Sequence, residues 1–250
     1  MKKLIAIIGA GLLIATTAAC GSNDSSDTTI TVYAAASLTD TFTAIGQEFE
    51  TANPGVRVRF NFGGSSNLVA QIQQGAPADV FASANPENMT AATADDLTAT
   101  APVDFATNTL QIATPPDNPA GITTLADLAR NDVTVVLCAP AVPCGAAAVQ
   151  IEQTSGVAID PVSEEQSVTD VLNKVITGEA DAGLVYVTDV DSAGDSVLGI
   201  EFPETSSVVN RYPIAPLAGS DHAATAQAFA DFVAGPAGQR ILQAAGFGAP

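Results

Sequence analysis

The chain has no tryptophan and one histidine, and aromatic residues make up only 5% of its 250 residues. Its core must therefore consist mainly of Val, Ile, Leu, Ala and Phe. Three cysteines are present, and one of them, Cys20, ends a leader-like segment. The two that remain, together with His222, fall short of the four ligands of a structural zinc site, so we expect no bound metal cation.

Basic residues are also scarce, because 8 Lys and Arg stand against 27 Asp and Glu, for a formal net charge of −19. Removal of the leader with Lys2 and Lys3 takes this charge to −21. A surface this acidic repels a phosphate backbone, which excludes nucleic acid as a partner. The acidity does not identify a small ligand, since it also keeps an exported protein soluble.

Sequence motifs of common enzymes are missing as well. The chain has no G-x-S-x-G, H-E-x-x-H or P-loop pattern. Ser37 or Cys144 would be a nucleophile only beside a base, and the one imidazole, His222, lies in a polar stretch typical of a surface. We therefore expect a binding protein without a cofactor, not an enzyme, and a Ser/Cys hydrolase is the remote alternative.

The only long apolar run is residues 4–19, which follow Lys2 and Lys3. It is shorter than the roughly 20 residues of a membrane-spanning helix, and it ends in small residues, as signal peptides do. Residues 17–20 (TAAC) resemble a bacterial lipobox, although threonine replaces the usual branched aliphatic residue.

This leader predicts a signal peptide over residues 1–19, lipidation of Cys20 and a polar tether over residues 20–29. The lipid would anchor the protein to the outer face of the cell membrane, an extracytoplasmic location. The alternatives are an ordinary signal peptide cut near Ala19 and an uncleaved anchor.

From residue 30 onward, short apolar segments alternate with amphipathic ones. The short runs predict strands at 30–35, 56–62, 79–82, 110–113, 133–137, 182–187 and 212–217. Helical spacing predicts helices after Ser37 and Ser65, and at 125–128, 144–153, 168–176 and 223–245, the last with a break at 235–236. Ser37 with Asp40, and Ser167 with Asp170, have the spacing of capping boxes.

This alternation predicts an α/β protein of mostly parallel sheets flanked by helices, in which ligands bind at the carboxyl ends of strands. Hydroxyl-bearing residues follow three of these strands, in 34–40 (AAASLTD), 63–68 (GGSSNL) and 184–189 (LVYVTD). In the first two a helix follows at once, so backbone N–H groups and serine hydroxyls converge on one place. The pattern predicts an anion site made of uncharged donors.

Three segments resemble the periplasmic molybdate-binding proteins of ABC importers. Residues 31–38 (TVYAAASL) are similar to the opening strand and loop of that family, residues 68–84 (LVAQIQQGAPADVFASA) to its next signature, and residues 183–186 (GLVY) to a third segment. The resemblance implies a two-lobed periplasmic-binding-protein fold (type II-like), with lobe I at 30–107 and 213–250 and lobe II at 108–212. It also implies a monomer that captures molybdate or tungstate for an ABC transporter permease.

The resemblance further implies a set of ligand contacts. These are the hydroxyl and N–H groups of Ser37 and Ser65, the N–H groups of Cys144 and Val168, and the phenol of Tyr186. Ser66 is the alternative to Ser65, and Cys144 stands where the family usually has alanine.

A site with donors alone has consequences for the ligand. Molybdate, tungstate and sulfate are fully deprotonated dianions that accept hydrogen bonds at every oxygen. Hydrogen phosphate would leave its O–H without an acceptor, at a cost of about 1–3 kcal/mol. Another oxyanion, such as sulfate or thiosulfate, is the alternative ligand. A site of donors alone can distinguish sulfate from molybdate only by the size of the ion.

Cys138 and Cys144 flank residues 139–143 and form an even pair in an exported chain, which favours a disulfide. Two free buried thiols are the alternative. Closing a loop of about seven residues would stabilise the fold by roughly 2–2.5 kcal/mol on the loop-entropy model. It would also hold the Cys144 N–H in place.

Overall fold

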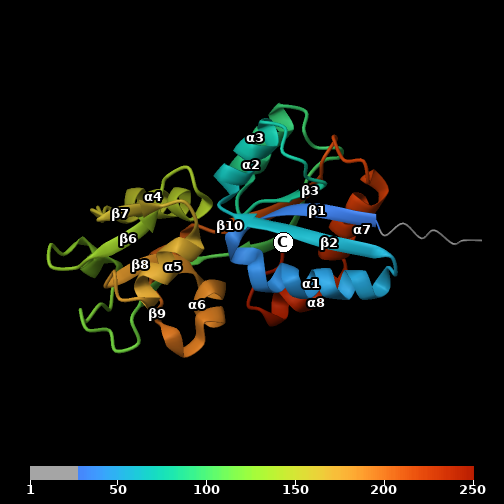
Figure 1. Ribbon diagram of the computed structural model, residues 1–250. Helices are drawn as coiled ribbons and strands as arrows, with labels where there is room; N and C mark the ends of the chain where they lie inside the picture. Colours follow the sequence, from blue (N-terminus) through green and yellow to red (C-terminus); the bar gives the residue numbers. More distant parts are fainter. Residues whose placement is uncertain (1–27) are drawn as a thin grey trace, which may run out of the picture.

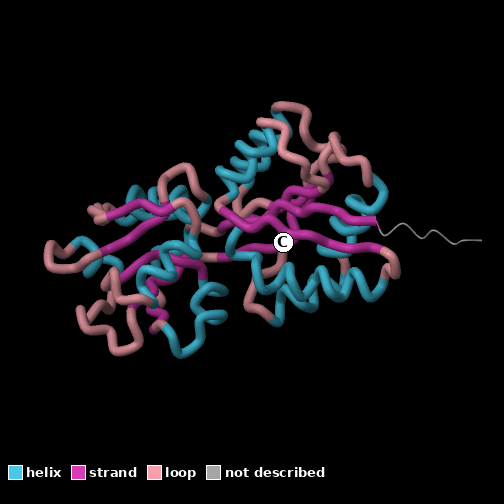
Figure 2. The backbone as a smooth tube through the Cα atoms, viewed as in Figure 1, coloured by secondary structure: helices cyan, strands magenta, loops and turns pink. Residues whose placement is uncertain are grey.

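The computed structural model describes residues 28–250, which form two α/β lobes side by side (Figure 1). Residues 1–27 lie outside the described part of the chain, and with them the expected signal peptide and the lipidation site Cys20. Strands and helices alternate through most of both lobes (Figure 2). Among residues 28–250, no helix is long and apolar enough to cross a membrane.

The first lobe is built on a five-stranded sheet in the order β2-β1-β3-β10-β4. Its strands are β1 (Thr28–Ala35), β2 (Val56–Gly63), β3 (Val80–Ala82), β4 (Val103–Asn108) and β10 (Asn210–Pro216). β1 pairs in parallel with β2 and β3, and Val32 lies opposite Phe60 and Val80. β10 is antiparallel to both of its neighbours, so it alone runs against the other four strands.

Helices cover both faces of this sheet (Figure 1). One face carries α1 (Thr39–Ala52), α7 (Ala223–Ala234) and α8 (Pro236–Ala244), and the other carries α2 (Ser65–Gln73) and α3 (Pro86–Ala94). Side chains alternate along β1, so Val32 packs toward the first group and Tyr33 toward the second. α1 buries Phe42, Ile45 and Phe49, the face that helical spacing predicts.

The second lobe repeats this plan on a sheet in the order β7-β6-β8-β5-β9. Its strands are β5 (Leu110–Thr114), β6 (Val135–Cys138), β7 (Ser163–Glu165), β8 (Ala182–Tyr186) and β9 (Leu198–Ile200). Helix α4 (Pro143–Ser155) lies on one face, and α5 (Val168–Ile176) and α6 (Val187–Ala193) lie on the other (Figure 1). The short 3-10 helices are η1 (Ala36–Leu38), η2 (Leu125–Ala129), η3 (Gly194–Ser196) and η4 (Pro203–Ser207).

The chain passes between the two sheets twice. β4 of the first sheet ends at Asn108 and β5 of the second begins at Leu110, and the chain re-enters the first sheet at Asn210. β5 and β10 begin at these crossings and run away from the cleft, whereas the other strands run toward it. The two-lobed α/β fold is confirmed, and each sheet is mixed because one of its five strands starts at a crossing.

Candidate oxyanion site

The residues expected to contact the ligand lie around one small cavity between the lobes. Its lining includes Ser37, Ser65, Cys144, Val168 and Tyr186. The first two belong to the first lobe and the other three to the second. Every residue that lines the cavity is uncharged. The space that the centre of a water molecule can occupy in this cavity is about 10 Å³. Pockets for larger organic ligands have roughly 300–1,000 Å³.

The starts of three helices supply backbone donors to this cavity. Ser65 and Val168 are the first residues of α2 and α5. α4 begins with Pro143, which has no N–H, so Cys144 carries the first backbone donor of that helix. The first N–H groups of a helix have no partner within the helix, and the positive end of its dipole lies there. Three such ends therefore favour an anion in the cavity.

The two serines at the start of α2 lie differently with respect to the cavity. Ser65 lines the cavity and its side chain is fully buried, whereas Ser66 is half-buried and does not line it. The Ala84 N–H donates to Ser65 Oγ at 3.1 Å. Because Ser65 Oγ accepts this bond, its own hydrogen is free to be donated into the cavity.

Neither of the two expected capping boxes forms in full, and the one at Ser37 is wrong. Ser37 lies inside η1, and its Oγ is 3.1 Å from Tyr212 Oη instead of capping α1. The extra 3-10 turn moves the start of α1 to Thr39, and Asp40 bonds Ser192 of the other lobe.

At α5, in contrast, the serine cap is present. Ser167 Oγ accepts from the Asp170 N–H at 3.2 Å and donates to the Asp170 carboxylate at 2.7 Å. This cap fixes the backbone immediately before Val168. It leaves the Val168 N–H as the first donor of the helix.

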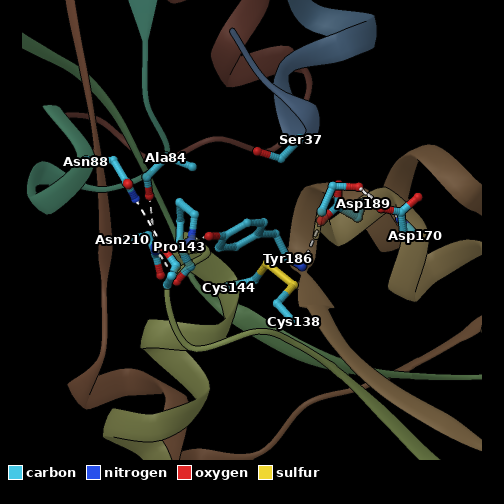
Figure 3. Close-up of a disulfide and its surroundings, with 12 residues drawn as sticks. Ser37, Ala84, Asn88, Cys138, Pro143, Cys144, Asp170, Tyr186, Asp189 and Asn210 are labelled. Atoms are coloured by element: carbon cyan, nitrogen blue, oxygen red, sulfur yellow. Dashed lines mark hydrogen bonds between the residues drawn. A yellow bond between two sulfur atoms is a disulfide. The ribbon is translucent and has the colours of Figure 1, made fainter. Parts of the chain in front are cut away.

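Tyr186 is the one phenol in the cavity lining. It ends β8, and its ring extends past the disulfide toward Asn210 (Figure 3). Asn210 Nδ2 donates to Tyr186 Oη at 3.0 Å. Burial raises the pKa of the Tyr186 phenol well above its ordinary value, and the nearby Tyr212 and Asp189 raise it further. The phenol therefore stays protonated at neutral pH and can donate to an anion.

The expected disulfide is present between Cys138 and Cys144, whose Cα atoms are 5.7 Å apart. It joins the last residue of β6 to the second residue of α4 (Figure 3). Next to it, Gly145 lies so close to the Ala139 carbonyl oxygen that a side chain at this position would overlap it. Both constraints fix the backbone that presents the Cys144 N–H.

Charged groups stay outside the cavity. Arg211 forms an ion pair with Asp104 at 3.5 Å on the surface, and its side chain is 59% exposed. His222 is exposed and immediately precedes α7, so it is not a base for Ser37. Within residues 28–250, no group of three or more His, Cys, Asp or Glu side chains could hold a metal ion.

One buried carboxylate lies directly beyond Tyr186. Asp189 accepts a hydrogen bond from the Tyr186 N–H at 2.9 Å, and its pKa is raised to about 7 by burial and by the charge of Asp40. It lines a larger groove on the other side of Ser37, not the small cavity.

Residues that hold the site from behind were missed by the sequence analysis. Ala84, Asn210 and Tyr212 bond the hydroxyls of Ser65, Tyr186 and Ser37 respectively. Their contacts join residues between 19 and 175 positions apart in the chain. No local motif carries such a signal.

Comparison with known proteins gives consistent matches over nearly the whole chain. A family model described as bacterial extracellular solute-binding protein matches residues 30–248. The molybdate-binding protein ModA of Mycobacterium tuberculosis (strain ATCC 25618 / H37Rv) is 48% identical over 248 residues, which cover 96% of this chain and 95% of that protein. The molybdate-binding protein ModA of Escherichia coli (strain K12) is 34% identical over 238 residues, covering 87% and 88%.

A solved structure gives the same result for the fold. The periplasmic molybdate-binding protein of Azotobacter vinelandii matches with a TM-score of 0.77 and 22% sequence identity. The match covers 88% of this chain and 99% of that chain. Both proteins therefore have the same two-lobed architecture.

Proposed function

The chain belongs to the family of bacterial extracellular solute-binding proteins, and on that basis we propose that it captures molybdate, and also tungstate, between its lobes for an ABC permease. One observation carries the proposal. Donors from both lobes, at Ser37, Ser65, Cys144, Val168 and Tyr186, meet at a single compact cavity that contains no charged residue.

The chemistry of these donors fits a deprotonated dianion. Helix-start N–H groups and hydroxyls supply hydrogen bonds to each oxygen of a tetrahedral anion, and hydrogen bonds to a charged group are each worth about 1.5–3 kcal/mol. Carboxylate ligands are typically held by an arginine fork, and no arginine lines the cavity.

The ligand acts on the equilibrium between open and closed lobes. An anion can favour closure only by contacting both lobes, because a ligand shifts an equilibrium by its difference in affinity for the two states. Ser65 and Cys144 supply donors from opposite sides of the cavity. The two crossings, at Thr109 and before Asn210, serve as the hinge.

A lipid on Cys20 anchors the protein outside the cytoplasm. The resemblance of residues 17–20 to a lipobox supports this lipidation. The donors at the cavity come from both lobes of one chain, which is compatible with a protein that works as a monomer. It binds its ligand without catalysis, because neither candidate nucleophile is activated. The Cys144 sulfur forms a disulfide, and Ser37 Oγ lies beside Tyr212 Oη instead of a base. Mass spectrometry of the membrane-extracted protein tests for a lipid mass on Cys20.

Calorimetric titration of the exported protein tests the ligand. We expect one molybdate or tungstate ion per chain, bound far more tightly than sulfate or phosphate and without any added metal cation. If sulfate or thiosulfate competes at a comparable concentration, the protein serves another oxyanion and selection by size is wrong.

A further inference from the structure

Asn210 links the two lobes directly behind the cavity. It is the first residue of β10, and only 6% of its surface is exposed. Its Nδ2 donates to the Ala84 carbonyl at 2.9 Å, in the first lobe, and to Tyr186 Oη at 3.0 Å, in the second. The Pro143 carbonyl lies 3.5 Å from the same nitrogen. Figure 3 shows these groups converging on the Asn210 side chain.

The orientation of the Asn210 amide follows from its neighbours. The Ala84 carbonyl oxygen can only accept a hydrogen bond, so the nitrogen of the amide must be on that side. The same NH₂ group then donates to Tyr186 Oη. Because Tyr186 Oη accepts from Asn210, the phenol hydrogen turns away from Asn210, toward the neighbouring Tyr212 phenol and the cavity that Tyr186 lines, where an anion is the stronger acceptor.

This arrangement has a cost elsewhere in the same side chain. Asn210 Oδ1 is buried and has no hydrogen-bond partner among the described residues. A buried polar atom without a partner destabilises a protein, and a leucine of similar size would avoid that penalty. An asparagine at this position therefore points to a function of its Nδ2 group.

We propose that Asn210 is a positioning residue for ligand specificity, which donates to Tyr186 Oη so that this phenol acts only as a donor toward the anion. The inference rests on the proposed function and adds to it. When Tyr186 acts only as a donor, its oxygen cannot accept a hydrogen bond from the O–H group of hydrogen phosphate. The Ala84 N–H acts on Ser65 Oγ in the same way, at 3.1 Å.

The decisive variant is Asn210→Asp, which keeps the shape of the side chain and replaces the donor by an acceptor. The ionised carboxylate of this variant turns the Tyr186 O–H away from the cavity, because the phenol then donates to it. We expect molybdate affinity to fall about 10-fold to 150-fold, the loss of one hydrogen bond to a charged group. The ratio of molybdate to phosphate affinity should also narrow, because Tyr186 Oη can then accept from a protonated oxygen.

The pH profile of this variant separates positioning from simple damage. A buried carboxyl has a raised pKa, and once protonated it donates to Tyr186 Oη as the amide does. Lowering the pH from about 8 to about 6 should therefore restore molybdate binding in Asn210→Asp. Tyr212 and Asp189, the other titratable groups that face Tyr186, are common to variant and wild type, so the wild-type profile is the control.

A double-mutant cycle with Tyr186→Phe completes the experiment. On the Tyr186→Phe background, Asn210→Asp should change the affinity ratio little, since no phenol remains to be oriented. Asn210→Leu adds no charge and removes the buried Oδ1. It should narrow the ratio of molybdate to phosphate affinity, and molybdate binding should not recover at low pH. It replaces Asn210→Asp in the cycle if that variant does not fold, as judged by circular dichroism.

The outcomes distinguish this inference from the proposed function. If Asn210→Asp and Asn210→Leu leave the molybdate-to-phosphate ratio unchanged, or act equally on both backgrounds, Asn210 does not position Tyr186. If the wild-type protein itself binds no molybdate, the proposed function fails, and this inference fails with it.

Discussion

The Cα atom of Gly64, in the first lobe, lies against the backbone carbonyl of Gln166, in the second, so closely that a methyl group on Gly64 would overlap the carbonyl oxygen. Gly64 immediately precedes α2 and Gln166 lies two residues before α5. Two of the helix starts that line the cavity are thus in backbone contact across the cleft. The absence of a side chain at residue 64 is what permits this closed arrangement.

We expect Gly64→Ala to weaken molybdate binding by preventing full closure. Gly64 has φ −63° and ψ 133°, which alanine adopts without strain, so each lobe should fold normally. Small-angle scattering should show less ligand-induced compaction than in the wild type, and calorimetry should show lower affinity.

The matched control for this variant is Gly219→Ala. Gly219 is exposed and has no atom within 4 Å of the position that a Cβ would take. It should bind and compact like the wild type. Unchanged affinity and compaction in Gly64→Ala would mean that the lobes do not need this contact to hold the ligand.

The pair Ser65→Ala and Ser66→Ala tests the donor at the start of α2. Ser65→Ala should weaken molybdate binding by about 1.5–3 kcal/mol, the value of a hydrogen bond to a charged partner. Ser66→Ala, one residue along the same helix and outside the cavity, should change the affinity little. Titration calorimetry measures both, and equal losses would show that helix stability, not a specific hydroxyl, determines binding.

The buried carboxyl of Asp189 should make the folded protein less stable as the pH rises. Its pKa is raised to about 7, whereas an aspartate in an unfolded chain has a pKa of about 3.9. Between these values the folded state binds a proton that the unfolded state has released, so the free energy of unfolding falls from about pH 4 to about pH 7. Above that range the loss is complete, and it amounts to about 4 kcal/mol.

Asp189→Asn should remove this loss, because an amide oxygen can still accept from the Tyr186 N–H without carrying a charge. Urea unfolding at about pH 8 should show a more stable variant, and the two proteins should converge near about pH 4. Asp191→Asn, an exposed position on the same helix, is the control. Parallel pH profiles for the wild type and Asp189→Asn would contradict the assignment.

The elements that could be predicted from the sequence are those whose signals are local. Residues 168–176 have a serine cap and a strongly amphipathic pattern, and α5 occupies that range. The break at 235–236 is also present, because Pro236 begins α8. β4 was missed because only Thr109 separates it from β5, so the two strands form one continuous stretch in the sequence.

Other missed elements have weak or short signals. α3 consists mostly of small and polar residues, and β7 and β9 are three-residue strands at the two edges of the second sheet. Ser37, Ser65 and Tyr186 could be found because they lie at or just after the ends of strands, whereas Cys144 and Val168 were expected only from the resemblance to the molybdate-binding family. Asn210 could not be found, since its bond to Ala84 joins residues 126 positions apart and depends on how the two lobes are arranged.

An uncharged site inside a strongly acidic protein has a kinetic consequence. The full chain carries a net charge of −19, so a dianion is repelled over long distances as it approaches. Salt screens this repulsion, since the Debye length falls from about 30 Å at 0.01 M to about 10 Å at 0.1 M. We therefore expect the association rate of molybdate to rise with ionic strength, the reverse of what a basic, steering site would give.

The dissociation rate should change little, because the bound anion is held by dipoles inside the cavity and not by exposed charges. Stopped-flow measurement of tyrosine fluorescence in potassium chloride is suitable, since the chain has no tryptophan and Tyr186 lines the cavity. Arg211→Ala removes the surface cation paired with Asp104 and should leave the dissociation rate unchanged. An association rate that falls as salt is added, together with faster dissociation in Arg211→Ala, would mean that charge holds the ligand and that uncharged donors do not suffice.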